Sequence, residues 1–179
     1  MKAVVVYESM YGNTHEVAEH IAEGLRRATV EATVVPVGDA TPDLLRSADL
    51  LVVGGPTHAH AMTRANTRKA AVDQAGPRGL AVEPDAGGSG LREWFDALPG
   101  TSGFAAAFDT RFDAATLLTG QAARGISGRL RRHGFRVVAP PESFLVDKLP
   151  RLLPGEAERA AQWGRTLAEL APVPAATRT

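Results

Sequence analysis

The sequence contains no cysteine, which excludes disulfide bonds, cysteine metal ligands and thiolate nucleophiles. Its 20 basic and 20 acidic residues cancel, so no overall field attracts nucleic acid, an anionic membrane or a strongly charged partner. No apolar run approaches the roughly 20 residues of a membrane-spanning helix, and the N-terminal run is too short for a signal peptide. We therefore expect a cytoplasmic protein with neither a nucleic-acid nor a membrane partner.

Short β-branched runs alternate with longer amphipathic runs along the 179 residues. The expected strands are 3–7, 31–37, 49–55, 103–109 and a last strand, 135–139 with 142–146, that Pro140 and Pro141 break. The expected helices are 13–28, 41–48, 65–75, 91–98, 114–134 and 155–170. This alternation predicts an α/β fold: a doubly wound five-stranded parallel sheet with helices on both faces. We expect one domain over residues 1–171, with a surface loop at 76–98 and a flexible tail at 172–179.

The segment ESMYGNT (8–14) joins the first expected strand to the first expected helix. Ser9, Asn13 and Thr14 supply side-chain donors, Gly12 allows close approach of a ligand, and the helix N-terminus directs N–H groups into the loop. The segment has no lysine for a nucleoside triphosphate loop and only one of the three glycines of a dinucleotide fingerprint. A phosphate cradle of another kind, or an ordinary helix cap, fits these residues.

Two further loops follow the third and fourth strands, GGPTHAHAM (54–62) and FDTRF (108–112). Together with Ser9-Met10-Tyr11-Gly12-Asn13-Thr14, they resemble the three FMN-binding loops of the flavodoxin family. Taken alone, 54–62 is equally typical of a plain Gly/Pro loop. The resemblance implies a flavodoxin-like fold with strand order 2-1-3-4-5 and FMN as the cofactor.

The resemblance also assigns binding residues, and the flavin would carry the chemistry without a catalytic side chain. The residues implied around the phosphate are Ser9, Met10, Tyr11, Gly12, Asn13 and Thr14. Those implied beside the ring and ribityl chain are Pro56, Thr57 and His58, and those on the pyrimidine side are Asp109, Thr110 and Arg111. His58 and His60 make at most half a metal site, so we expect no metal.

The sequence departs from the family in two ways. Flavodoxins that act as carriers are generally acidic, whereas this chain is neutral. Its second and third loops carry few aromatic side chains to stack on the ring, which predicts weaker FMN retention unless Trp94 folds over the site. Arg111 would place a cation beside the flavin and favour its reduction, or it pairs with Asp109 or Asp113 as a surface ion pair.

Three functions remain open at this point. One is FMN-dependent electron transfer between protein redox partners. Another is an FMN oxidoreductase that takes hydride from NAD(P)H and reduces a quinone or similar small acceptor, although no nicotinamide motif is recognisable. The third is a flavin-free interaction domain. The sequence does not determine the partner, the oligomeric state or the role of loop 76–98.

Overall fold

The computed structural model describes residues 1–58 and 60–172. The strands are β1 Lys2–Tyr7, β2 Glu31–Pro36, β3 Leu50–His58, β4 Ala61–Met62, β5 Gly103–Phe112, β6 Phe135–Val137 and β7 Glu142–Val146. The helices are α1 Asn13–Arg27, α2 Pro42–Arg46, α3 Ala65–Ala75, α4 Leu91–Ala97, α5 Thr116–Thr119, α6 Ala122–Arg132 and α7 Glu156–Leu170, with a short 3-10 turn, η1, at Val37–Asp39.

The strands form one sheet in the order β2-β1-β3-β5-β6, and β7 also pairs with β5. All these pairings are parallel, and β6 and β7 occupy successive stretches of the same edge of β5. Pro140 and Pro141 separate the two strands because proline cannot donate to the ladder. The predicted five-position order 2-1-3-4-5 is therefore confirmed, with the fifth position shared by β6 and β7.

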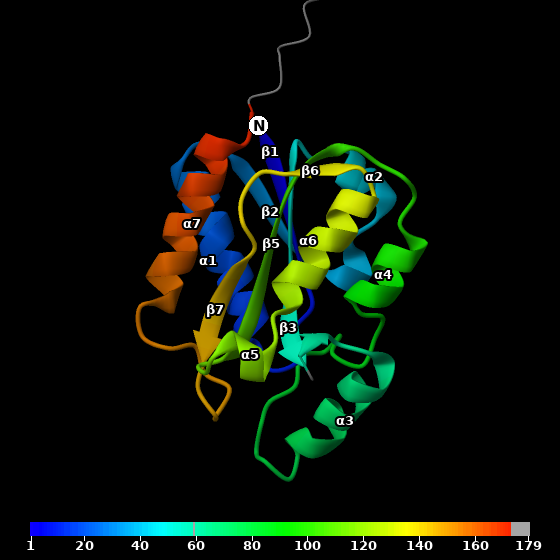
Figure 1. Cartoon of the computed structure of the whole chain (residues 1–179), viewed down its shortest axis with the longest axis vertical. Coiled ribbons are helices and arrows are strands. Elements are labelled where there is room, and N and C mark those ends of the chain that lie inside the picture. The colour runs from blue at the N-terminus through cyan, green and yellow to red at the C-terminus, as the bar shows by residue number, and fades with distance from the viewer. Residues whose placement is uncertain (59, 173–179) are drawn as a thin grey trace, which may run out of the picture.

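Helices cover both faces of the sheet (Figure 1). One apolar cluster joins α1 and α7 to the sheet through residues such as Val17, Ile21 and Leu167. The other joins α2, α4 and α6, with Phe95 and Ile126 among its buried members. The central strands are buried on both faces, which explains their continuous apolar runs.

Two glycines let α1 and α7 cross at close range. A Cβ atom on Gly24 would lie 1.9 Å from the carbonyl oxygen of Ala161, and one on Gly164 would lie 2.2 Å from that of Ile21. Any side chain at either position would force the helices apart. This contact fixes α1, whose N-terminus faces the candidate phosphate site, against the body of the sheet.

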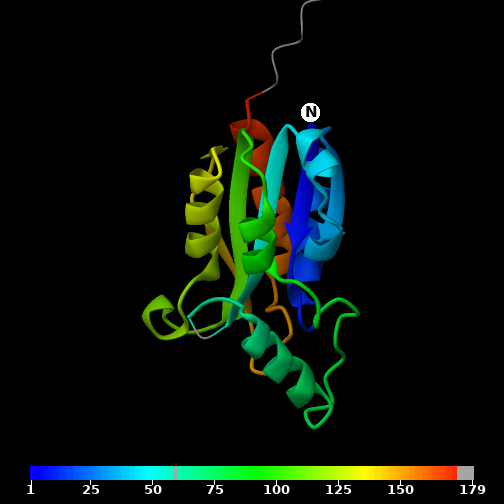
Figure 2. The same cartoon turned by 90° about the vertical axis from the view of Figure 1, so that its right-hand side faces the viewer.

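Helix α3 lies beyond the carboxyl ends of the strands, away from both helical layers (Figures 1 and 2). The Tyr11 hydroxyl donates to the Ala71 carbonyl over 2.9 Å and so holds α3 to the first loop. The chain then returns to α4 through residues 76–90, and the Glu83 N–H donates to the Met10 carbonyl over 3.0 Å. Segment 76–98 thus contacts the first loop on its outer side, and its helix α4 packs against one face of the sheet.

Several element bounds differ from the predictions. The expected helix 114–134 is divided into α5 and α6 at Gly120, which has a φ of 74°. The third strand continues to His58 and turns back into the antiparallel strand β4. The tail predicted at 172–179 lies almost wholly outside the described residues, and the domain boundary at 171 stays a prediction. Within the described part of the chain, every helix is too short or too polar to span a bilayer.

Candidate functional site

A cavity of about 520 Å³ opens at the carboxyl ends of β1, β3 and β5. This volume is within the range of about 300–1,000 Å³ that is usual for small-molecule sites. All three loops predicted from the sequence reach it. Its lining includes Ser9, Met10, Tyr11, Asn13, Thr14, Pro56, Thr57, His58, Thr110 and Arg111. Gly12 borders a shallower groove beside the cavity, and Asp109 lines neither.

The first loop presents donors at the start of α1. Gly12 has a φ of 92°, a conformation that favours glycine, and no side chain among the described residues caps the helix N-terminus. The Gly12 N–H donates to Ser9 Oγ over 3.1 Å. Ser9 is therefore oriented as an acceptor within the loop and keeps its own proton for a ligand. The uncapped N–H groups of the first turn remain available to an anion.

Thr14 and Thr110 connect the first loop to β5. Their hydroxyl oxygens lie 2.8 Å apart and both side chains are buried. One hydroxyl donates to the other, so the accepting hydroxyl still has a proton to donate. Asn13 Nδ2 donates to the Pro150 carbonyl over 2.7 Å, which ties the same loop to the turn after β7.

Thr57 and Asp109 form the floor beneath the second and third loops. Thr57 Oγ1 and the Ala123 N–H both donate to Asp109 Oδ2, over 3.0 and 2.8 Å. Burial raises the pKa of Asp109 despite these two hydrogen bonds, and its Oδ1 has no hydrogen-bond partner among the described residues. Asp109 therefore supports the site from below, and its side chain does not reach the cavity on the predicted pyrimidine side.

His58 lies in the cavity wall at the end of β3. Burial lowers the pKa of its imidazole, so the ring is neutral at physiological pH. His60 is exposed and has a φ of 70°. In the described part of the chain, no three His, Asp or Glu side chains come together as a metal site would need.

Arg111 lines the cavity from β5. Its Nη1 donates to the carbonyls of Phe112 and Ala114, over 3.2 and 2.7 Å. Its Nε is buried and has no partner among the described residues. Within the same residues it forms no ion pair with Asp109 or Asp113, so the ion-pair alternative is wrong.

Trp94 does not supply the missing aromatic side chain. Its indole Nε1 donates to the Ala40 carbonyl over 3.1 Å, and its ring meets the Phe95 ring edge at a centroid distance of 4.8 Å. It thus packs in the layer of α2 and α4, outside the cavity. The six-membered aromatic rings in the cavity lining are those of Tyr11 and Phe112.

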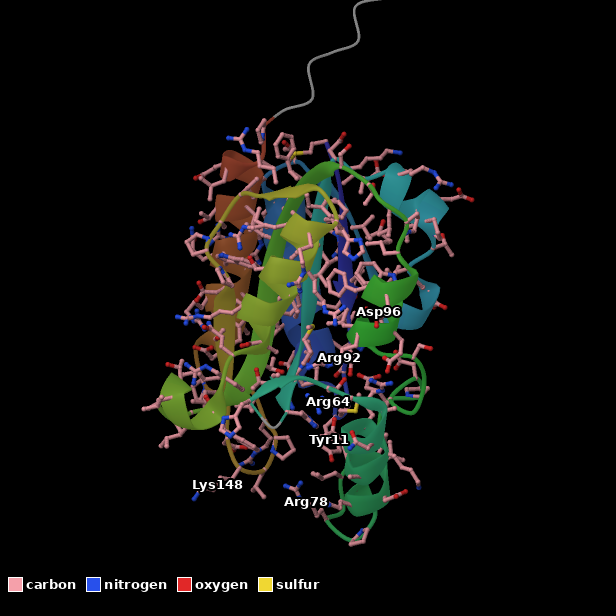
Figure 3. All side chains as sticks on the ribbon, turned by 45° about the vertical axis from the view of Figure 1, so that its right-hand side comes forward. Tyr11, Arg64, Arg78, Arg92, Asp96 and Lys148 are labelled. Carbon is pink, nitrogen blue, oxygen red and sulfur yellow. The ribbon has the colours of Figure 1, made fainter. Side chains whose placement is uncertain are left out.

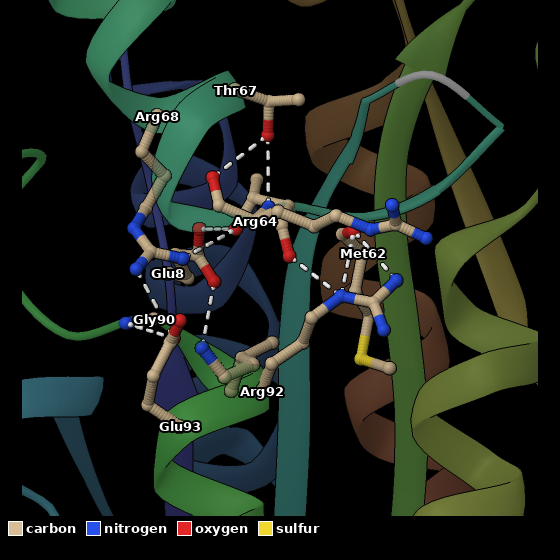
Figure 4. Close-up of polar contacts among 10 residues, drawn as sticks. Glu8, Met62, Arg64, Thr67, Arg68, Gly90, Arg92 and Glu93 are labelled. Atoms are coloured by element: carbon tan, nitrogen blue, oxygen red, sulfur yellow. Dashed lines mark hydrogen bonds and ion pairs between the residues drawn. The ribbon is translucent and has the colours of Figure 1, made fainter.

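A polar network behind the first loop, with Glu8, Thr63 and Arg68 buried and Glu93 exposed, was not predicted (Figure 4). Glu8 accepts hydrogen bonds from the Thr63 hydroxyl and from the Leu91 N–H, the latter over 2.8 Å. Arg68 donates to Thr63 over 3.2 Å and pairs with Glu93 over 3.1 Å. Burial raises the pKa of Glu8, while Arg68 opposes that rise. The network joins the end of β1 to α3 and α4. In the sequence, its one visible indication is the position of Glu8, an acidic residue directly after an apolar strand.

The rim of the cavity is basic. Arg78 lines the cavity and its Nη2 donates to the Lys148 carbonyl over 3.5 Å. Figure 3 shows Arg64, Arg78 and Lys148 near Tyr11, at the end of the molecule where the cavity opens.

Comparisons with known proteins show what the chain resembles in sequence and in fold. The flavodoxin family model matches residues 5–84, which include the first two loops. A flavodoxin from the domain Archaea shares 23% identity and a TM-score of 0.66, over 94% of this chain and 97% of that one. Oxidised flavodoxin 1 from Bacillus cereus shares 21% identity and a TM-score of 0.66, over 94% of this chain and 98% of that one. Two-electron reduced flavodoxin from Megasphaera elsdenii shares 19% identity and a TM-score of 0.58, over 93% of this chain and 98% of that one.

Proposed function

We propose that this chain, a flavodoxin-like protein by its fold and by the family match over residues 5–84, binds FMN in the cavity and transfers electrons through it. The observation that carries the proposal is the uncapped N-terminus of α1, which faces the cavity beside two buried hydroxyls, Ser9 and Thr14. Backbone N–H groups and hydroxyls can hold a phosphate without a cation, and the first loop contains no lysine or arginine.

The residues that line the cavity fit FMN. Ser9, Asn13, Thr14 and the N–H groups of the first turn would hold the phosphate. Pro56, Thr57 and His58 would border the flavin. Arg111 would face its polar edge with the Nε–H that has no protein partner among the described residues. When bound, FMN supplies reversible uptake of one or two electrons, while the protein sets its position and the charge around it.

We assign Asp109 a supporting role in this site. Its carboxylate orients Thr57 and caps the first turn of α6, so it fixes the second loop relative to the third. His58 would present a neutral ring to the flavin, because burial lowers its pKa. Neither residue transfers a proton in this proposal.

The carrier and the NAD(P)H reductase can be separated on the FMN-loaded protein. We expect NADH and NADPH to leave the visible flavin absorbance unchanged under anaerobic conditions, while dithionite bleaches it. Rapid bleaching by either nicotinamide cofactor would instead establish the reductase. Failure of the protein to take up FMN would leave the interaction domain as the function.

A further inference from the structure

Exposed apolar side chains gather at the mouth of the cavity. The large hydrophobic residues with substantial exposure in the described chain are Phe112 (49%), Leu117 (90%), Leu118 (70%), Leu149 (61%) and Leu170 (47%). All except Leu170 belong to β5, α5 or the turn after β7, and Phe112 and Leu118 also line the cavity. We call Phe112, Leu117, Leu118 and Leu149 the mouth patch. Concentration of such residues beside one opening marks an interaction surface.

Contacts of the backbone hold these segments together. The Asp113 N–H donates to the Val146 carbonyl over 3.1 Å, which joins the end of β5 to the end of β7. His60 forms a parallel bridge with Gly120, which joins α5 to the second loop. The mouth patch is thus one surface formed by three neighbouring segments.

Three cations that have no carboxylate partner among the described residues lie at the end of the molecule where the cavity opens (Figure 3). Arg64, Arg78 and Lys148 are exposed and form no ion pair within the described residues. Their carboxylate neighbours are largely neutralised, because Asp73 pairs with Lys69 and Asp147 pairs with Arg151.

Other acids leave the sign of this rim unchanged. Two exposed acids lie near it, Asp113 at the end of β5 and Glu16 in the groove beside Pro150, against the three cations. Glu83 and Asp85 lie on another side of the first loop, where Glu83 bonds His15 and both raise the pKa of Tyr7. The rim of the mouth patch therefore carries net positive charge on a chain whose total is zero.

We propose that the mouth patch, with its rim of Arg64, Arg78 and Lys148, is the docking surface for an acidic redox protein, an inference that rests on the proposed electron transfer. An apolar centre with a charged rim is the common anatomy of transient interfaces. Complementary charge would orient the partner and accelerate association. The partner's redox centre would then face the open side of the cavity, where Phe112 and Leu118 border the flavin site.

The test uses two proteins of known charge, an acidic [2Fe–2S] ferredoxin and a basic cytochrome c. Binding of each to the FMN-loaded protein is measured by calorimetry at about 0.05 M and about 0.5 M salt. We expect the ferredoxin to bind at low salt and to weaken at high salt, and the cytochrome to bind more weakly. Absence of ferredoxin binding at low salt, or preference for the cytochrome, overturns the proposal.

Variants outside the cavity lining locate the surface. The double variant Arg64→Glu, Lys148→Glu should weaken ferredoxin binding about tenfold or more. The double variant Leu117→Ser, Leu149→Ser should also weaken ferredoxin binding, with little change in the dependence of that binding on salt concentration.

Matched controls lie at the opposite end of the fold. Helix α6 begins beside Thr57 in the cavity wall and ends at Arg132, so Arg132 lies one helix length away from the cavity. Leu170 is the last residue of α7. Arg132→Glu and Leu170→Ser should leave binding unchanged. Equal losses in these controls contradict the assignment.

Two other occupants of the mouth patch, a second copy of the chain and a membrane, would give different results. Loss of a homodimer in Leu117→Ser would assign the mouth patch to a second copy of the chain, and charge-dependent binding to anionic vesicles would assign it to a membrane. Either result contradicts the proposal. Visible absorbance of the same samples reports FMN loading, so ferredoxin binding without FMN would contradict only the proposed cofactor function.

Discussion

Thr57 Oγ1 donates a hydrogen bond to Asp109 Oδ2 over 3.0 Å, and this contact joins the second loop of the cavity to the third. The Ala122 N–H donates to the same Thr57 hydroxyl over 2.9 Å, and the Ala123 N–H donates to the same Asp109 oxygen over 2.8 Å. The pair therefore fixes the cavity floor and satisfies two N–H groups at the start of α6, which would otherwise lack partners.

The buried Asp109 carboxyl makes stability depend on pH. Burial raises its pKa above the ordinary value of 3.8, so the folded state retains a proton that the unfolded state has already lost. Stability must then fall as pH rises from the unfolded pKa through the folded one. Asp109→Asn keeps an oxygen acceptor and should reduce this fall by the part that Asp109 contributes, while Glu8, whose pKa burial also raises, keeps its own part. Urea unfolding between about pH 3 and about pH 7 measures it, and an unchanged slope would show that Asp109 is not its source.

Arg68 should be far more important to stability than its exposed neighbour Lys69. Arg68→Met leaves Glu8 buried without its nearby cation and should cost about 3 kcal/mol in the free energy of unfolding. Lys69→Met removes an exposed ion pair with Asp73 and should cost less than about 0.5 kcal/mol. Urea denaturation of both variants gives the comparison, and similar costs would argue against a role for the polar network.

The α1–α7 crossing gives a second matched pair. Gly24→Ala puts a methyl group into the Ala161 carbonyl and should destabilise the protein by about 2–3 kcal/mol. Gly128→Ala adds a methyl group that, apart from its own helix backbone and chain neighbours, meets no described atom within 4 Å, and should stabilise the protein by about 0.5–1 kcal/mol. Thermal unfolding should show a lower melting temperature for Gly24→Ala and a higher one for Gly128→Ala. An unchanged melting temperature in Gly24→Ala would mean that the helices separate at little cost in free energy.

Arg111 should tune the bound flavin. Its guanidinium lines the cavity without a carboxylate partner among the described residues, so its charge favours the reduced, more negative flavin. Arg111→Gln should lower the two-electron reduction potential by about 30 mV, which corresponds to about 1.4 kcal/mol. Arg132→Gln, at the far end of α6, is the control. Equal potentials in wild type and Arg111→Gln would contradict this role.

Local sequence signals predicted the fold well. The helix at 65–75 has its predicted bounds, and in the structure Thr41 caps α2 and Pro36 ends the edge strand β2. Each signal acts within a few residues, through apolar periodicity, a hydroxyl cap or a missing N–H group. The division of the last strand at Pro140 and Pro141 followed from the same chemistry.

Contacts between distant residues were not predictable in the same way. Glu8 and Leu91 are 83 positions apart, and Thr57 and Asp109 are 52 apart. No pattern within either segment specifies these pairings, because they depend on how the loops meet at the carboxyl edge of the sheet. Sequence therefore predicted the residues of the cavity lining more completely than the buried groups that support them.

A comparison of FMN with riboflavin, which lacks the phosphate, tests the proposed phosphate site at the start of α1 most directly. Fluorescence quenching should show FMN binding at least about tenfold more tightly than riboflavin, a difference of about 1.4 kcal/mol. The double variant Ser9→Ala, Thr14→Val should lose most of that difference while still binding riboflavin. Equal affinity for both flavins, or no binding of either, would contradict a phosphate site at the start of α1.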